Sequence, residues 1–287
     1  MLANAKVCLY PRDQQEAVRI LEEYGGQALV LAGGTTAALN SDPAVTTLVD
    51  LTRIGLDSIE EEDGEWSLGC CVRIQQIATH AGIAGLCDGM LSTAAGSVGS
   101  RPIRNMTTLG GNVVQVFRWS DPPVALMAMN AGFELMGPAG SRRLSADEFF
   151  ERHPRQVLQR SEILTRVYVR RPQGASGGAF IKYARTAFDL AVVDAAVCIE
   201  LDGRNCSAAR VVVGGTRTVP WRSREAEKIL VGSRLTKAVM RRAAAAARLE
   251  TRAAGGVRTD GEYRRQMVEV IAGRVIEQAA QRARERS

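Results

Sequence analysis

Two short stretches of the sequence place adjacent glycines beside small hydroxyl or amide side chains. The first is Ala32-Gly33-Gly34-Thr35-Thr36, which ends an apolar run, and the second is Thr108-Leu109-Gly110-Gly111-Asn112, followed nine residues later by Asp121. Glycine lacks a Cβ and permits positive φ, so consecutive backbone N–H groups can converge on phosphate oxygens. Threonine and asparagine add hydrogen-bond donors without bulk. We interpret the two stretches as loops that grip one nucleotide cofactor, although a tight turn alone accounts for many such glycine pairs.

The sequence offers little other catalytic machinery. It lacks the G-x-G-x-x-G spacing of dinucleotide-binding folds, the Walker G-x-x-x-x-G-K-[ST] loop, the H-E-x-x-H metal motif and any C-x-x-C pair. Its histidines, His80 and His153, are expected to be ordinary surface or turn residues, and its six cysteines buried thiols. We therefore predict no metal ligand and no catalytic side chain, which is the pattern of a protein whose bound cofactor does the redox chemistry.

Composition indicates an ordinary globular protein. Hydrophobic residues make up 46% and charged residues 24% of the 287 residues, and no apolar run is long enough to span a membrane. The first residues do not resemble a secretory signal, so we expect a cytoplasmic protein. The net charge of +6 comes largely from arginine-rich helices late in the chain, which without aromatic residues or a recognition motif favour solvated faces or acidic partner subunits over nucleic acid.

The elements expected around these loops divide the chain in two. A buried strand over residues 28–32 enters the first loop, an acidic turn is expected over 58–65, and Pro122 begins a helix. The glycine-rich stretch 172–178 is the best candidate linker. Three strands, at 179–184, 192–201 and 208–213, and three helices, at 222–231, 235–252 and 261–284, are expected beyond it. We predict an α+β fold with domains at 1–173 and 177–287, the second with a three-stranded antiparallel sheet and a helix bundle.

Several ordered motifs resemble the FAD-binding subunit of the molybdenum hydroxylases, the family that includes the medium subunits of carbon monoxide dehydrogenase and xanthine dehydrogenase. The opening helix at 11–24 is similar to that of the family, and the two glycine stretches resemble A-G-G-[TH]-x-L and I-R-N-x-G-T-I-G-G-N. Further matches are Ser161-Glu162-Ile163-Leu164, the Lys182 segment at 181–185 and Glu262-Tyr263-Arg264-Arg265. The resemblance implies a two-subdomain FAD-binding domain of the PCMH type at 1–173.

The resemblance also implies roles for individual residues. Ala32 to Thr36 and Thr108 to Asn112 would bind the pyrophosphate and ribityl region of FAD. Asp121 would accept hydrogen bonds from cofactor hydroxyl groups, Leu164 would pack against the ring system, and Lys182 would reach the cofactor from the second domain. The alternatives are a helix-capping Asp121, a core Leu164 and a surface Lys182. FAD is expected to bind non-covalently, because neither glycine stretch contains a histidine or cysteine.

By the same resemblance the chain would relay electrons within a larger complex. FAD would receive them from [2Fe-2S] clusters on a small subunit and pass them to NAD, a quinone or another acceptor, while a large molybdopterin-binding subunit acts on the substrate. The family assembly is (αβγ)2. The sequence Phe117-Arg118-Trp119 departs from the family pattern and leaves the identity of the electron acceptor open. The substrate of the complex is also open, and could be CO, a purine, an N-heterocycle or an aldehyde. Two rivals are a single-chain FAD reductase like UDP-N-acetylenolpyruvoylglucosamine reductase and a flavin-free scaffold subunit.

Overall fold

The computed structural model of the chain describes residues 4–37, 42–253, 255 and 259–287. The chain forms two compact units. Unit 1 comprises Met1–Gln76, Ser100–Val116 and Ala131–Val169, and unit 2 comprises Ile77–Gly99, Phe117–Asn130 and Arg170–Ser287. Both units are therefore discontinuous in sequence, whereas the division predicted at 173 and 177 cuts the chain once.

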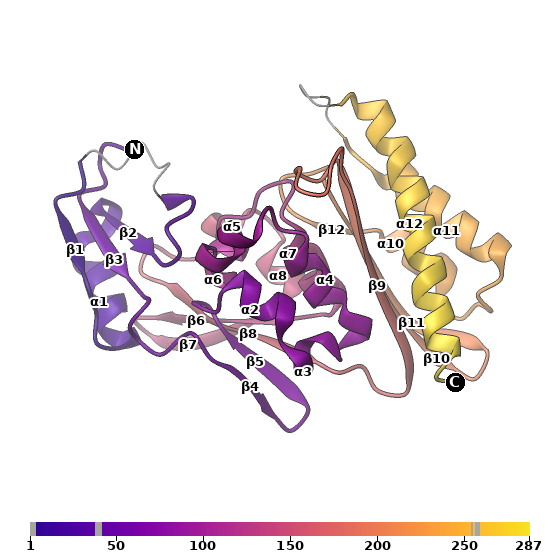
Figure 1. Cartoon of the computed structure of the whole chain (residues 1–287), viewed down its shortest axis with the longest axis horizontal. Helices are drawn as coiled ribbons and strands as arrows, with labels where there is room; N and C mark the ends of the chain where they lie inside the picture. Colours follow the sequence, from indigo (N-terminus) through magenta and orange to yellow (C-terminus); the bar gives the residue numbers. More distant parts are fainter. Residues whose placement is uncertain (1–3, 38–41, 254, 256–258) are drawn as a thin grey trace. The chain divides into compact units, whose positions relative to one another are not determined.

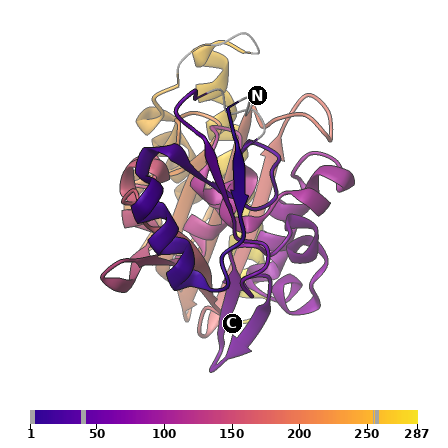
Figure 2. The ribbon, with the colours of Figure 1, turned by 90° about the vertical axis from the view of Figure 1, so that its left-hand side faces the viewer.

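Unit 1 contains a small parallel sheet with a helix beside it (Figure 2). Strand β3 (Thr47–Asp50) lies between β1 (Val7–Leu9) and β2 (Ala28–Leu31), and both pair with it in parallel. Helix α1 (Gln14–Tyr24) begins where the Asp13 side chain accepts a hydrogen bond from the backbone N–H of Glu16 at 2.7 Å. The first glycine loop follows β2 directly, so it lies at the edge where the carboxyl ends of these strands meet.

The second sheet of unit 1 has five strands in the order β4-β5-β8-β6-β7. Its strands are β4 (Ile59–Glu62), β5 (Glu65–Gly69), β6 (Gly132–Gly137), β7 (Gly140–Ser145) and β8 (Ile163–Arg170). The acidic turn expected over 58–65 is wrong, because β4 and β5 form a hairpin whose two-residue turn has positive φ at Asp63 (50°) and Gly64 (74°). The acidic side chains of β4 are exposed on this edge strand. On one face of this sheet, the ring of Phe133 in β6 stacks on the ring of Phe149, with centroids 4.1 Å apart.

Short helices join these strands and contribute to both units. They are α2 (Ile74–Thr79), α3 (Ala81–Ala84), α5 (Arg101–Met106), α6 (Leu109–Val114), α8 (Ala146–Phe149) and α9 (Pro154–Val157), with single 3-10 turns at Gly25–Gln27 and Cys87–Gly89. Helix α8 begins at a cap, where Ser145 and Glu148 form a reciprocal capping box.

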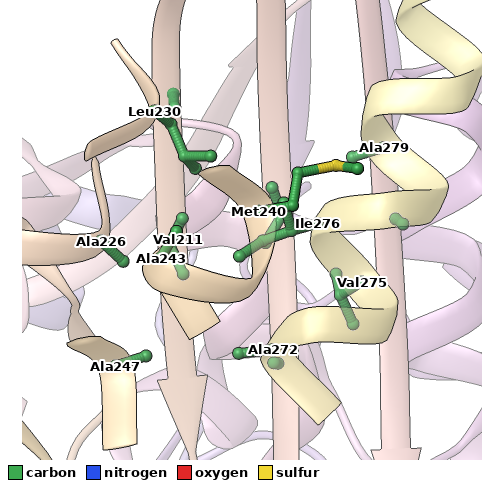
Figure 3. Close-up of a cluster of buried hydrophobic side chains, with 14 of the residues drawn as sticks. Val211, Ala226, Leu230, Met240, Ala243, Ala247, Ala272, Val275, Ile276 and Ala279 are labelled. Atoms are coloured by element: carbon green, nitrogen blue, oxygen red, sulfur yellow. The ribbon is translucent and has the colours of Figure 1, made fainter. Parts of the chain in front are cut away.

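Unit 2 is built on an antiparallel sheet in the order β12-β11-β10-β9, and the three predicted strands are confirmed. They are β9 (Ala175–Tyr183), β10 (Val193–Asp202) and β11 (Asn205–Gly214), to which β12 (Trp221–Arg222) adds a two-residue fourth strand. The helices α10 (Arg224–Leu230), α11 (Lys237–Glu250) and α12 (Gly261–Arg284) pack on one face (Figure 1). The core between them is apolar and rich in alanine, with Ile276 and Met240 among the larger side chains (Figure 3).

The opposite face of this sheet is covered as well. Helices α4 (Met90–Gly96) and α7 (Asp121–Ala128) contact β9, β10 and β11, and every residue of α7 is buried. The sheet of unit 2 is therefore a buried middle layer, so side chains that alternate along β10 enter two different interiors. One interior contains Val193, Ala195 and Val197, and the other contains Asp194.

The stretch expected to be a linker begins β9 instead. A Cβ on Gly177 would lie 2.2 Å from the carbonyl oxygen of Ala279 in α12, and one on Gly178 would lie 2.5 Å from that of Cys87. These glycines are thus required by close packing on both faces of the strand. Residues 174–178 also match the G-x-S-x-G pattern of hydrolases, but Ser176 lies within a strand and not at a strand-to-helix turn.

Candidate cofactor site

The first glycine stretch lies directly against residues 106–108, at the start of the second stretch, in unit 1. A Cβ on Gly33 would lie 2.1 Å from the carbonyl oxygen of Met106, and Gly34 has a φ of 72°. The hydroxyl of Thr35 lies 3.4 Å from that of Thr107. The first glycine is therefore required by close approach of backbone and the second by a left-handed conformation. The structure brings together the stretches that the sequence analysis assigned to one site.

The second stretch is a helix start and not an open loop. Thr108 caps α6, and its hydroxyl accepts a hydrogen bond from the N–H of Gly111 at 3.2 Å. The N–H groups of Leu109 and Gly110 donate to carbonyl oxygens of the segment after β5, at 2.8 and 2.7 Å. These three amides are satisfied within the chain, so the predicted convergence of backbone donors at residues 109–111 is not the geometry that this helix presents.

Gly111 and Asn112 are the positions of this helix at which a ligand could bind. A Cβ on Gly110 would lie 2.8 Å from the Cβ of Cys70, so this glycine is required by internal packing. Gly111 is exposed, and among the described residues a Cβ there would meet only the Thr108 hydroxyl within 4 Å, at 3.0 Å. The side-chain oxygen of Asn112 is buried and has no donor among the described residues. A ligand with hydroxyl or N–H groups would supply the missing donor.

Asp121 and Lys182 form a buried ion pair in unit 2. The Nζ of Lys182 donates to Oδ2 of Asp121 at 2.9 Å and to the carbonyl oxygen of Ser97 at 2.8 Å. The side chain of Lys182 is 9% exposed and that of Asp121 is 3% exposed. Burial raises the pKa of Asp121 to about 6, against the opposing effect of the Lys182 ammonium. Asp121 is also the first residue of α7, where the helix dipole favours a negative charge.

The sequence analysis did not single out Asp194, which joins this pair. It is fully buried, and its register places it opposite Lys182 on β9 and Gly214 on β11. Burial and the Asp121 carboxylate raise the pKa of Asp194 well above its ordinary value. The signal was present in the sequence, because a single aspartate interrupts an apolar run over residues 191–199 and a buried charge is costly unless it is paired or neutralised.

Leu164 and the closing motif both lie in packed surroundings. Leu164 is 4% exposed in β8 of unit 1, opposite Leu135 of β6. In unit 2, the hydroxyls of Tyr183 and Tyr263 lie 2.6 Å apart, and the buried Arg264 donates to the carbonyl oxygen of Gly215. The contacts of Tyr263 and Arg264 therefore hold the start of α12 against the sheet of unit 2.

The stretch that departs from the family pattern, Phe117-Arg118-Trp119, is held by local contacts. The rings of Phe117 and Trp119 stack with centroids 5.3 Å apart and an interplanar angle of 8°. The backbone N–H of Phe117 donates to the Ser120 hydroxyl at 3.0 Å, and the N–H of Ser120 donates to the Phe117 carbonyl oxygen at 2.9 Å. Trp119 is 36% exposed, so this aromatic pair reaches the surface of unit 2 two residues before Asp121 in the chain.

Two further classes of site find no support in the described part of the chain. Within it, no group of three or more histidine, cysteine, aspartate or glutamate side chains could hold a metal ion. No helix among the described residues is both long and apolar enough to cross a membrane.

Both parts of the chain match known protein families. Residues 3–172 match the FAD binding domain in molybdopterin dehydrogenase, and residues 178–279 match the CO dehydrogenase flavoprotein C-terminal domain. The chain is 30% identical to the carbon monoxide dehydrogenase medium chain of Afipia carboxidovorans, over 96% of each chain. It is 26% identical to the glyceraldehyde dehydrogenase medium chain of Sulfolobus acidocaldarius, over 93% of this chain and 95% of that one.

Solved structures give the same result. The fold is similar to that of a chain of carbon monoxide dehydrogenase from Hydrogenophaga pseudoflava, with a TM-score of 0.92 and 27% identity over 98% of this chain and 99% of that one. It is also similar to quinoline 2-oxidoreductase from Pseudomonas putida 86, with a TM-score of 0.87 and 28% identity over 97% and 98%. With both domains matched in order, the chain belongs to the family of FAD-binding subunits of molybdopterin dehydrogenases.

Proposed function

We propose that the chain passes electrons from [2Fe-2S] clusters of a partner subunit, through FAD, to an external acceptor such as NAD or a quinone. The chain is an FAD-binding oxidoreductase subunit by family membership. Its relatives include medium chains of dehydrogenases whose names specify carbon monoxide and glyceraldehyde, so the family supports a redox role without fixing the substrate. FAD, when bound, supplies reversible electron uptake and release, and the protein supplies its binding and orientation.

The observation that carries this proposal is the direct packing of the two glycine stretches. The contact between Gly33 and the Met106 carbonyl leaves no space for a side chain, and the open face of Gly111 and the donor-free oxygen of Asn112 lie in the same unit. We propose that Ala32 to Thr36 and Thr108 to Asn112 bind the pyrophosphate and ribityl region of FAD non-covalently. Because the first amides of α6 are satisfied internally, the second stretch would act by close approach and through Asn112.

Asp121, Leu164 and Lys182 keep their proposed roles toward the cofactor, with one refinement. Lys182 already donates to Oδ2 of Asp121, so a cofactor hydroxyl would bond to Oδ1, which has no donor among the described residues. Leu164 lies within a packed sheet, so a contact with the cofactor would use its small remaining exposed surface. The stacked pair of Phe117 and Trp119 is a candidate contact for the electron acceptor.

We further propose that the chain assembles with a large molybdopterin-binding subunit and a small [2Fe-2S] subunit, as an (αβγ)2 complex in the cytoplasm. The medium chains among its relatives support the assembly, and the six cysteines, all in the described part of the chain, are free thiols, as expected in a reducing compartment. Residues 1–173 and 177–287 remain the proposed domains.

Purification of the chain with its natural partners would test the electron-relay role. The tagged chain, isolated from its source cells, should carry FAD together with a molybdenum-containing large subunit and an iron–sulfur small subunit. Recovery of the chain alone with FAD would favour the single-chain reductase, against which the match over residues 178–279 argues. Recovery with partners but without flavin would favour the scaffold.

A further inference from the structure

The buried cluster of Asp121, Lys182 and Asp194 has more negative than positive charge. Asp194 extends from β10 toward α7, and Gly214 on the neighbouring strand leaves the space that its carboxyl group occupies beside Val124. A Cβ on Gly214 would lie 2.2 Å from Oδ1 of Asp194. The sheet is therefore shaped around this carboxyl group, which is 0% exposed.

Three carboxyl oxygens of the cluster lack a hydrogen-bond donor among the described residues. Lys182 donates to Oδ2 of Asp121 and to the carbonyl oxygen of Ser97. Oδ1 of Asp121 and both carboxyl oxygens of Asp194 are buried and have no donor among the described residues. A carboxylate can only accept hydrogen bonds, whereas a protonated carboxyl group can also donate one. A single proton on Asp194 would give Oδ1 of Asp121 a donor and balance the charge of the cluster.

The surroundings decide which carboxyl group holds that proton. Asp121 has the Lys182 ammonium at 2.9 Å and the amino end of α7, both of which stabilise its ionised form. The two carboxyl groups lie within hydrogen-bonding reach of each other, and burial together with the charge of Asp121 raises the pKa of Asp194 well above its ordinary value. The neighbouring elements contribute the carbonyl oxygen of Ser97, which follows α4, and Gly214 of β11. Neither group is titratable.

We propose that Asp194 is a positioning residue, which stays protonated at neutral pH and donates a hydrogen bond to Oδ1 of Asp121. This bond holds the Asp121 carboxylate and, through it, the Lys182 ammonium in fixed orientations inside unit 2. The consequence for FAD rests on the proposed function, because it requires Asp121 and Lys182 to contact the cofactor. The presence of the proton does not depend on that function.

Infrared spectroscopy of the full chain tests the proton directly. At neutral pH the wild-type protein should show a C=O stretching band of a buried carboxylic acid that shifts in D2O. Asp194→Asn should remove this band, and Asp202→Asn, a control on the exposed end of the same strand, should retain it. A wild-type spectrum without this band, or a band that survives in Asp194→Asn, would overturn the proposal, whether or not the chain binds FAD.

FAD titration then tests the positioning role. Asp194→Asn keeps a donor toward Asp121 and should bind FAD with wild-type affinity, whereas Asp194→Ala removes the donor and should weaken binding by about tenfold or more. Wild-type affinity should fall as alkaline pH removes the Asp194 proton, and the affinity of Asp194→Asn should not. Equal affinity in Asp194→Ala and wild type would overturn the positioning role. A chain that shows the infrared band but takes up no FAD would contradict only the proposed function.

Discussion

Replacing Gly111 by valine should remove FAD from the chain while leaving the chain folded. Gly111 is exposed in the first turn of α6, and within 4 Å an added Cβ would meet only the Thr108 hydroxyl. The main structural cost is the capping hydrogen bond between these residues, about 1 kcal/mol. Replacing a helical glycine by valine returns a few tenths of a kcal/mol, so net destabilisation should stay below ~1 kcal/mol.

The effect on FAD binding should be much larger. A diphosphate that approaches the backbone closely is held by charge-assisted hydrogen bonds, each worth ~1.5–3 kcal/mol. Because the amides of residues 109–111 are satisfied within the chain, the donors would come from the first glycine stretch. A valine side chain on Gly111 would displace the diphosphate and break at least two of these bonds. The expected loss is ~3–6 kcal/mol, which corresponds to a decrease in affinity on the order of 100- to 10,000-fold.

Fluorescence titration of FAD with the apoprotein measures this loss, and circular dichroism measures the melting temperature of each variant. Gly26→Val is a matched control in unit 1, because no atom lies within 4 Å of a Cβ at that position. A folded Gly111→Val protein with wild-type affinity would refute the assignment of this stretch to the cofactor. Equal loss of FAD in Gly26→Val would show that the effect is not specific.

Three further predictions follow from the geometry. Lys182→Met leaves the Asp121 carboxylate buried without its cation and should lower the free energy of unfolding in urea by ~3–5 kcal/mol. Adding Asp121→Asn should restore part of this stability, and no recovery would argue against the ion pair. Gly33→Ala places a Cβ 2.1 Å from the Met106 carbonyl oxygen and should cost ~1–3 kcal/mol of stability and abolish FAD uptake, and an unchanged melting temperature would contradict this contact. The folded-state pKa of Asp194 lies above its unfolded value, so the stability of the wild type should fall as pH rises between the two values, by up to ~1.4 kcal/mol per pH unit. Urea midpoints that change with pH in parallel for wild type and Asp194→Asn would contradict that titration.

The elements with a strong pattern were predictable from the sequence. The helix after Asp13 and the cap at Ser145 are local signals, in which a side chain bonds to a nearby backbone N–H, and both formed as such signals predict. The long strands of unit 2 were found because apolar runs of this length suit a sheet that is buried on both faces.

The errors arose where distant parts of the chain decide the local structure. The glycines at 177 and 178 resemble a linker, but they are small because α12 and Cys87 pack against the two faces of β9. These contacts cannot be read from neighbouring residues.

The Gly110-Gly111 stretch resembles an open loop, but Thr108 caps a helix there. This cap is a local signal, and the two glycines, which are poor helix formers, obscure it.

The candidate site was predictable in part for the same reason. The types and spacing of the glycines indicated two stretches that act together, and Gly33 does lie on the Met106–Thr108 segment. Packing between strands and helices far apart in sequence decides which amides remain available. It also places the ion pair of Asp121 and Lys182 beside a second buried carboxyl group, that of Asp194.

The most direct test of the central claim is the absorption spectrum of the purified chain, followed by release and chromatography of any yellow chromophore. The glycine stretches of unit 1 predict a flavin spectrum and FAD in a one-to-one ratio to the chain, released by heat without proteolysis because the binding is non-covalent. A colourless, folded chain that takes up no added FAD would contradict the proposal and favour the scaffold subunit.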